Sequence, residues 1–258
     1  MFDEDSKDVG PLAPLIPGNV AGWLGLHDRY GSMDLQRLLR PAIGYAESGF
    51  PATQITSFAM SEVVPRLLRF PDSAALVLGA VEKAHSPGSR IVAPALAASL
   101  KAIAAGGVDE FYRGGLARRI VQGVRDAGGL FTEEDMAGYR AEWGEPVGVN
   151  YRGYRVITTP PGSAGFQILQ ALKLMETFGE EELAYMRPDS VHLLVEAIKL
   201  AVVDRIAYGG DPDHVPVPLD ALLSEEYALA QRERIDPGRA ALLPDVRHHG
   251  DLPEGALK

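Results

Sequence analysis

One stretch of this chain combines a strand pattern, a turn and a helix, and it limits what the rest can fold into. Residues 151–158 alternate and are rich in β-branched and aromatic side chains, which is typical of a β-strand. The proline-rich segment 160–162 ends this strand, because proline cannot donate a ladder hydrogen bond. Ser163 follows at the position of a helix N-cap. The helix after it carries an apolar face, made by Ile168, Leu169, Leu172 and Met175.

Helical periodicity covers most of the remaining chain. The predicted helices span, approximately, residues 17–30, 32–48, 53–69, 73–81, 94–103, 116–127, 133–135, 190–208 and 224–235. Pro41 predicts a kink in the second of them, or two helices in tandem. In the first helix, Gly18, Gly22 and Gly25 predict close packing against another backbone. Thr132 is the predicted N-cap of the short acidic helix.

Two helices have faces that we expect to be buried. In the helix of residues 53–69 the inward residues are predicted to be Ile55, Phe58, Ala59 and Val63. Asp189 or Ser190 caps the helix that ends before Gly209. Its predicted apolar stripe consists of Val191, Leu194, Val195, Ile198 and Val202, and its predicted outer residues are Glu196, Lys199 and Asp204.

The strands are too few for a self-sufficient sheet. Many helices and about two strands leave one apolar sheet face without a cover. We therefore expect residues 1–258 to form a single incomplete domain, with residues 1–16 and 236–258 as loop or tail.

Composition and charge exclude several classes of function. The net charge of -10 disfavours a nucleic-acid partner. The absence of cysteine excludes disulfides, thiolate nucleophiles and cysteine metal sites. No membrane span is expected, because the most apolar stretch, residues 91–105, contains Pro94 and Lys101. The acidic first ten residues do not resemble a signal peptide. The compartment stays open between cytoplasmic and periplasmic or secreted.

Ser163 is the first candidate for chemistry, and three interpretations are open. A nucleophile elbow requires G-x-S-x-G after a strand, and here the first glycine is one position out of register. The histidines that follow it in the chain are His192, His214, His248 and His249. Alternatively, the serine is a helix cap, or the helix N-terminus at residues 163–165 binds an anion such as a carboxylate.

The other polar clusters have simpler interpretations. Asp211 and Asp213 lack the ligand pattern of a calcium loop and are expected to cap a turn. The acidic run 133–135 is expected to be a solvated helix start, and His27 to lie on a helix face. GxGxxG, GxxxxGK[ST] and HExxH motifs are absent. We therefore assign no cofactor-binding, metal-binding or catalytic residue.

Five segments, in the correct order, resemble the γ-glutamyltransferase (glutathione hydrolase) family of N-terminal-nucleophile hydrolases. The matching segments are Pro17-Gly18-Asn19-Val20-Ala21-Gly22, Tyr30 to Phe50, Phe111 to Tyr139, Tyr151-Arg152-Gly153-Tyr154 with Pro160-Pro161, and Glu196 to Asp213. The resemblance extends to about Ile235. It implies an α+β fold, a four-layer αββα sandwich to which this chain contributes mainly helices and a few strands.

The resemblance also implies an activity and a partner. Members of the family transfer a γ-glutamyl group from glutathione or related amides to water or an amine, through an N-terminal threonine exposed by autoprocessing. That threonine opens a small subunit, so the expected partners are this subunit and a small γ-glutamyl substrate. Thr158-Thr159 is followed by Pro160 and is not the family's Thr-Thr-His-type run. The chain alone is therefore expected to be a large-subunit segment without activity.

Departures from the family pattern leave other functions open. The family's Pro-Pro-Pro-Ser-Ser-Gly-Gly loop is here Pro160-Pro161-Gly162-Ser163-Ala164-Gly165-Phe166. Because of this difference, a related amide acylase is an alternative function. A noncatalytic, partner-binding remnant and a serine hydrolase that uses Ser163 are the remaining alternatives.

Overall fold

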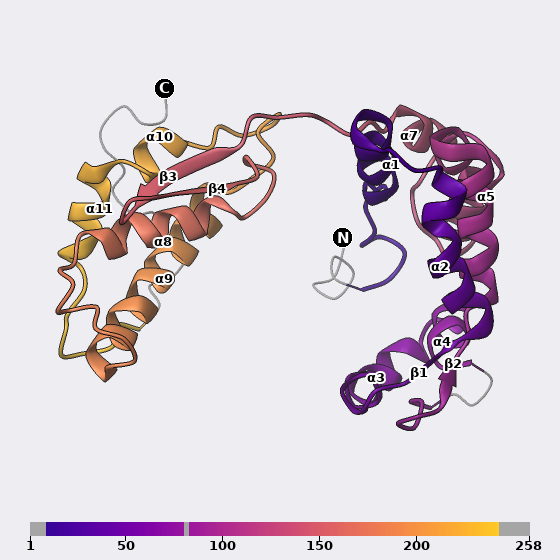
Figure 1. Ribbon diagram of the computed structural model, residues 1–258, viewed down its shortest axis with the longest axis horizontal. Coiled ribbons are helices and arrows are strands. Elements are labelled where there is room, and N and C mark those ends of the chain that lie inside the picture. The colour runs from indigo at the N-terminus through magenta and orange to yellow at the C-terminus, as the bar shows by residue number, and fades with distance from the viewer. Residues whose placement is uncertain (1–8, 80–82, 243–258) are drawn as a thin grey trace. The chain divides into compact units, whose positions relative to one another are not determined.

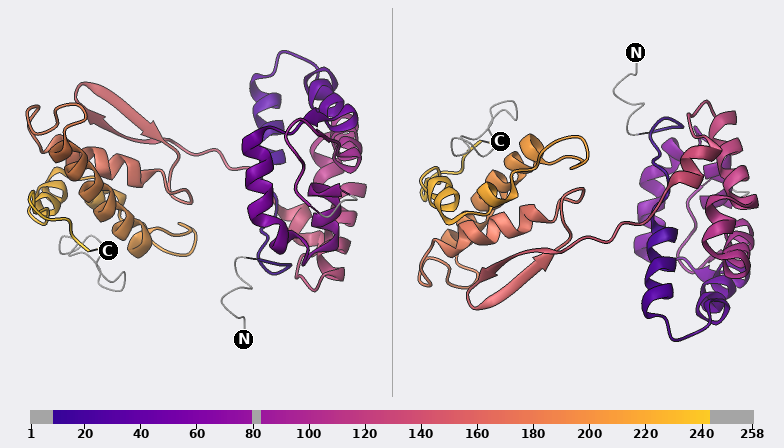
Figure 2. Two further views of the ribbon diagram at one scale, coloured as in Figure 1. Left: turned by 90° about the horizontal axis from the view of Figure 1, so that it is seen from below. Right: turned by 90° about the horizontal axis from the view of Figure 1, so that it is seen from above.

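A computed structural model describes residues 9–79 and 83–242. The chain divides into two compact units, Met1–Glu142 and Trp143–Lys258, and each is described by itself. Both units are drawn in Figures 1 and 2.

Unit 1 is made almost entirely of helices. Its elements are α1 (Asn19–Tyr30), α2 (Leu35–Ser48), β1 (Phe50–Pro51), α3 (Gln54–Leu67), α4 (Pro71–Val77), β2 (Arg90–Ile91), α5 (Pro94–Tyr112), α6 (Gly115–Asp126) and α7 (Glu133–Gly138). The helix α2 continues across Pro41, so the prediction of two tandem helices is wrong. The helix predicted for residues 94–103 continues in α5 as far as Tyr112, with a break at Gly107, which takes a φ of 60°.

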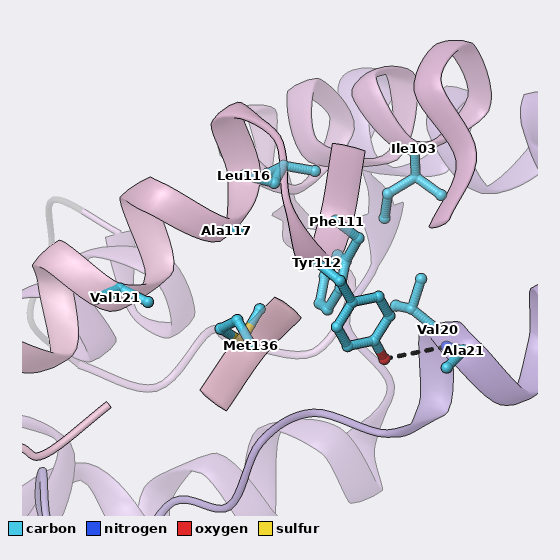
Figure 3. Packing of buried hydrophobic residues seen from close by; sticks show 9 residues of the cluster. All are labelled: Val20, Ala21, Ile103, Phe111, Tyr112, Leu116, Ala117, Val121 and Met136. Atoms are coloured by element: carbon cyan, nitrogen blue, oxygen red, sulfur yellow. Dashed lines mark hydrogen bonds between the residues drawn. The ribbon is translucent and has the colours of Figure 1, made fainter. Parts of the chain in front are cut away.

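Tyr112 is at the centre of the unit 1 core, which Figure 3 shows. Its hydroxyl donates to the carbonyl of Pro17 over 2.5 Å and accepts the N–H of Ala21 at 3.1 Å. Its ring stacks on Tyr139 with centroids 5.6 Å apart. Burial raises the pKa of Tyr112, so the hydroxyl stays protonated and ties α5 to the start of α1.

The glycines of α1 differ in their surroundings. A Cβ atom at Gly18 would lie 2.1 Å from the hydroxyl oxygen of Tyr139, so only glycine fits there. Gly22 and Gly25 have no described atom within 4 Å of a Cβ position. Gly18 is therefore closely packed, but against the side chain of Tyr139 and not against the backbone predicted, and the prediction is wrong for the other two within the described part of the chain.

The predicted inward face of α3 is exposed in this unit. Ile55 and Phe58 are 81% and 67% exposed, and Val63 is also exposed. The helix packs mainly against the short α4, and its buried residue is Ser57. The prediction of an inward apolar face is wrong because periodicity identifies an apolar stripe without showing what covers it.

The described part of unit 2 contains a β-hairpin and four helices. Its elements are β3 (Val147–Tyr151), β4 (Tyr154–Thr158), α8 (Phe166–Glu176), α9 (Pro188–Tyr208), α10 (Leu219–Leu222) and α11 (Glu225–Arg232). The strands are antiparallel, with Val149 opposite Val156. Between them Arg152 and Gly153 both have positive φ, 48° and 83°, as in a type I′ turn. Residues 151–158 are therefore a turn and one strand, and not the single strand predicted.

The helix α8 is the central element of unit 2. The hairpin β3–β4 packs on one side of it, α9 packs on another, and α11 lies against it as well (Figures 1 and 2). Its buried residues include Phe166, Leu169 and Leu174, whereas Ile168 of the predicted face is exposed.

The helix α9 presents the opposite face to the one predicted. It begins at Pro188, with Arg187 rather than Asp189 or Ser190 at the N-cap. Glu196 and Asp204 are only 3% and 1% exposed. The apolar residues at exposed positions are Val191, Leu194, Val195, Ile198 and Ile206. The buried face consists mainly of Leu193, Ala197, Ala201 and Val203, and the carboxylates of Glu196 and Asp204 accept hydrogen bonds within it. The expected core face is left exposed.

The architecture confirms a helix-rich α+β protein. Within the described residues the two sheets are separate, and each has two antiparallel strands. No described helix is long and apolar enough to cross a membrane. Residues 9–16 and 236–242 contain no helix or strand, and the rest of both end segments lies outside the described residues.

Candidate functional site

The loop between β4 and α8 holds the predicted candidate Ser163. Its close approach to the strand depends on Gly165, where a Cβ atom would lie 2.1 Å from Oγ1 of Thr158. Glycine is the residue that permits this contact between the helix start and the end of β4. The loop is further tied by the hydroxyl groups of Thr159 and Ser163, which lie 2.5 Å apart.

The structure places Ser163 in the loop and not at the helix N-cap. The N-cap of α8 is Gly165, which makes no side-chain cap bond. The Ser163 hydroxyl donates to the carbonyl of Pro160 at 3.2 Å and accepts from the N–H of Gly165 at 3.4 Å. The N-cap prediction is therefore two residues early, because Ser163 stabilises the turn before the helix.

No activated nucleophile is formed around Ser163 in the described residues. A serine nucleophile needs a base within hydrogen-bond reach. Nε2 of His192 instead lies 2.8 Å from the carbonyl oxygen of Asp236, and His214 lies 3.9 Å from Asp211. His248 and His249 lie outside the described residues. The geometry does not support the serine hydrolase alternative.

A small cavity of about 190 Å³ borders the Ser163 loop. It is lined by Gly162, Ser163, Ala164, Phe166, Arg205, Gly209 and Gly210. Arg205 is one of these lining residues, so the anion-binding interpretation gains a cation. Sequence reasoning missed Arg205, although its spacing from the helix-ending Gly209 places it in the last turn of α9.

A buried polar network is centred on Asp204, the residue before Arg205 in α9. Oδ2 of Asp204, on α9, accepts hydrogen bonds from the amide of Gln170 on α8 and from the hydroxyl of Tyr227 on α11. Burial raises the pKa of Asp204, and burial next to this carboxyl also raises the pKa of Tyr227. The network joins three helices and fixes the part of α9 that carries Arg205.

The remaining polar candidates are structural. Oδ1 of Asp211 accepts the N–H of Asp213 at 3.0 Å, as in a turn cap. Thr132 and Asp135 form a reciprocal capping box, as predicted for the short acidic helix, and this lowers the pKa of Asp135. His27 bonds through its ring to the carbonyl of Met33. Among the described residues, His, Asp and Glu form no cluster of three that could hold a metal ion.

Comparison with known proteins identifies the family. The family model described as γ-glutamyltranspeptidase matches residues 1–254. The chain belongs to the γ-glutamyltranspeptidase family. This is a family of N-terminal-nucleophile hydrolases, as the resemblance implied.

The similar proteins include both hydrolases and acylases. The acylase ACY 1 proenzyme of Pseudomonas sp. strain SE83 is 40% identical over 241 residues, which are 92% of this chain and 43% of that protein. The glutathione hydrolase proenzyme of Escherichia coli K12 is 35% identical over 246 residues, 94% of this chain and 42% of that protein. The chain thus spans about two fifths of the length of these curated relatives.

Solved structures agree with the sequence comparison. The γ-glutamyltranspeptidase of Helicobacter pylori is similar with a TM-score of 0.87 and 31% identity, over 98% of this chain and 73% of that one. The cephalosporin acylase of Bacillus halodurans has a TM-score of 0.80 and 34% identity, over 88% of this chain and 42% of that one. The family assignment therefore rests on both sequence and fold.

Proposed function

We propose that this chain acts as part of a γ-glutamyltransferase or glutathione hydrolase. The reaction would transfer a γ-glutamyl group from glutathione or a related amide to water or an amine acceptor. The observation that carries this proposal is the match of residues 1–254 to the family, with a glutathione hydrolase proenzyme among the relatives. The nucleophile is an N-terminal threonine on a partner polypeptide, the small subunit.

Exposed apolar surface supports the need for a partner. The stripe of α9 runs along the helix opposite to its buried face, so α9 is apolar nearly all round. A helix of that kind is normally covered on all sides. In unit 1, Ile55 and Phe58 are similarly open. We propose that the partner covers such faces and that both units then form one domain.

The proposed complete fold is a four-layer αββα sandwich. In it the hairpin β3–β4 joins further strands, and α8 and α9 form a helical layer on one face of the sheet. The hairpin supports this proposal because its outer face carries Ile157, which is 59% exposed. Two strands with an open apolar face are not a stable sheet by themselves.

A related amide acylase is the second candidate. It is favoured by the 40% identity to the acylase ACY 1 proenzyme and by the likeness to a cephalosporin acylase. The glycine and alanine at 162 and 164, which differ from the family loop, are consistent with an altered wall near a substrate.

The test combines the chain with a separately produced small-subunit polypeptide that begins with threonine. Release of p-nitroaniline from γ-glutamyl-p-nitroanilide, compared with cleavage of an amide-linked cephalosporin, separates the two activities. A Thr→Ala change at the partner's first residue is the control. Turnover by this chain without the partner would refute the proposal that its nucleophile lies elsewhere.

A further inference from the structure

Residues 236–241 form a short arm that lies along α9. The arm begins with a turn, in which Oδ1 of Asp236 accepts the N–H of Gly238 at 2.8 Å. The carbonyl of Asp236 lies 2.8 Å from Nε2 of His192. Because a carbonyl only accepts, this ring nitrogen must carry the proton.

The end of the arm is held by an ion pair. Nζ of Lys199 and Oε1 of Glu196 are 2.7 Å apart. The same two side chains also bind both backbone groups of Ala241. The N–H of Ala241 donates to Oε2 of Glu196 at 3.3 Å, and its carbonyl accepts from Nζ of Lys199 at 2.9 Å.

This arrangement explains why Glu196 is buried. An isolated carboxylate at 3% exposure would be costly, whereas this one is paired with Lys199 and accepts a backbone N–H. The three α9 residues that touch the arm, His192, Glu196 and Lys199, are spaced by four and three positions and so lie on one side of the helix. The recognition of Ala241 involves its main chain and not its methyl group.

We propose that Glu196 and Lys199 are positioning residues that clamp the backbone of Ala241 and fix the path of the arm across α9. The clamp thereby holds the arm, as far as Ala241, on the side of α9 that carries His192, Glu196 and Lys199. Leu242, which follows the clamped residue, is 92% exposed. The clamp is thus placed to orient the arm while the partner polypeptide docks, a step that rests on the proposed function.

The clamp is tested first in this chain alone. Three substitutions each remove part of the clamp: Lys199→Met, Glu196→Gln and Ala241→Pro. The proline change acts by deleting the backbone N–H donor of residue 241. Hydrogen exchange at arm amides and tryptic cleavage after Arg239 should both become about tenfold faster. Glu233→Gln, which changes an exposed carboxylate at the end of α11, should leave both rates unchanged.

The double variants and the assembled protein provide the deciding outcomes. Lys199→Met combined with Ala241→Pro should be no faster in exchange than the more affected single variant, because both break one unit.

With the partner, the clamp variants should assemble several-fold more slowly than the Glu233→Gln control. The clamp proposal would be refuted if Lys199→Met and Ala241→Pro kept the wild-type rates of hydrogen exchange at the arm amides while their circular dichroism was unchanged. Absence of γ-glutamyl turnover in the wild-type assembly would instead refute only the proposed function.

Discussion

The hydroxyl of Tyr227 donates a hydrogen bond to Oδ2 of Asp204 over 2.9 Å, and this bond joins α11 to α9 in the interior of unit 2. Removing it should destabilise the unit. We expect Tyr227→Phe to lower the free energy of unfolding by about 1.5–3 kcal/mol, because the buried carboxyl loses a donor. Urea denaturation followed by the fluorescence of Trp143, in a Trp23→Phe background, measures this change. An unchanged midpoint would contradict the assigned bond.

The same carboxyl predicts a pH dependence of stability. Burial raises the pKa of Asp204 above its ordinary value of 3.8, so the folded state binds its proton more tightly than the unfolded state. Its contribution to stability is therefore complete below pH 3.8 and is lost as the pH rises through the folded pKa. As the pH rises, the unfolding free energy of the wild type should therefore fall relative to that of Asp204→Asn. A difference that is flat from pH 3.5 to about 8 would contradict the raised pKa.

The contact between Gly165 and Thr158 predicts a steric effect with a rescue. Gly165→Ala places a methyl group 2.1 Å from Oγ1 of Thr158 and should cost about 1–3 kcal/mol. Thr158→Ala removes the two nearest of the three opposing atoms, so the double variant should recover part of the loss. A double-variant cycle in urea measures the coupling, and simple additivity would show that the clash is relieved elsewhere.

Two glycines in different backbone conformations, Gly153 in the hairpin turn and Gly25 in α1, should respond in opposite ways to substitution by alanine. Gly153→Ala should destabilise unit 2 by about 1 kcal/mol, because alanine does not favour a φ of 83°. Gly25→Ala, in helical backbone with no described atom near its Cβ position, should instead stabilise α1 by about 0.5–1 kcal/mol. Thermal unfolding of both variants provides the comparison. A loss of stability in both would show that backbone conformation does not control these sites.

The exposed stripe of α9 predicts a variant that affects assembly and not folding. Val195→Asp should change the stability of the isolated chain by less than about 0.5 kcal/mol, since this side chain is already 43% exposed. It should prevent association with the partner, which sedimentation detects. Leu229→Asp, at a similarly exposed position on α11, is the matched control and should still associate.

Local signals in the sequence were sufficient for the approximate positions of most helices and for the N-cap of α7. Thr132, followed by three acidic residues, predicts the N-cap of α7, and the structure adds a capping box with Asp135, three residues further on. Pro94 marked the start of α5, and Ser224 is the observed N-cap of α11. These features depend on neighbouring residues alone. The family could also be identified, because it rests on several segments in order.

Features that depend on distant partners could not be predicted. The face of α9 was misassigned because Asp204 and Glu196 are buried by contacts with Tyr227, Gln170 and Ala241, far along the chain. The hairpin turn was missed because Arg152 is not a typical residue for positive φ. The position of Arg205 beside the Ser163 loop depends on the packing of α9 next to α8, which the sequence does not reveal.

The proposed function makes this chain a structural part of a γ-glutamyl-transferring enzyme whose nucleophile lies on a partner polypeptide. It is tested by the release of p-nitroaniline from γ-glutamyl-p-nitroanilide by the purified chain, with and without the threonine-bearing polypeptide. We predict turnover only in the mixture, and its loss when the first threonine of the partner is replaced by alanine. Turnover by the chain alone, abolished by Ser163→Ala, would contradict the claim.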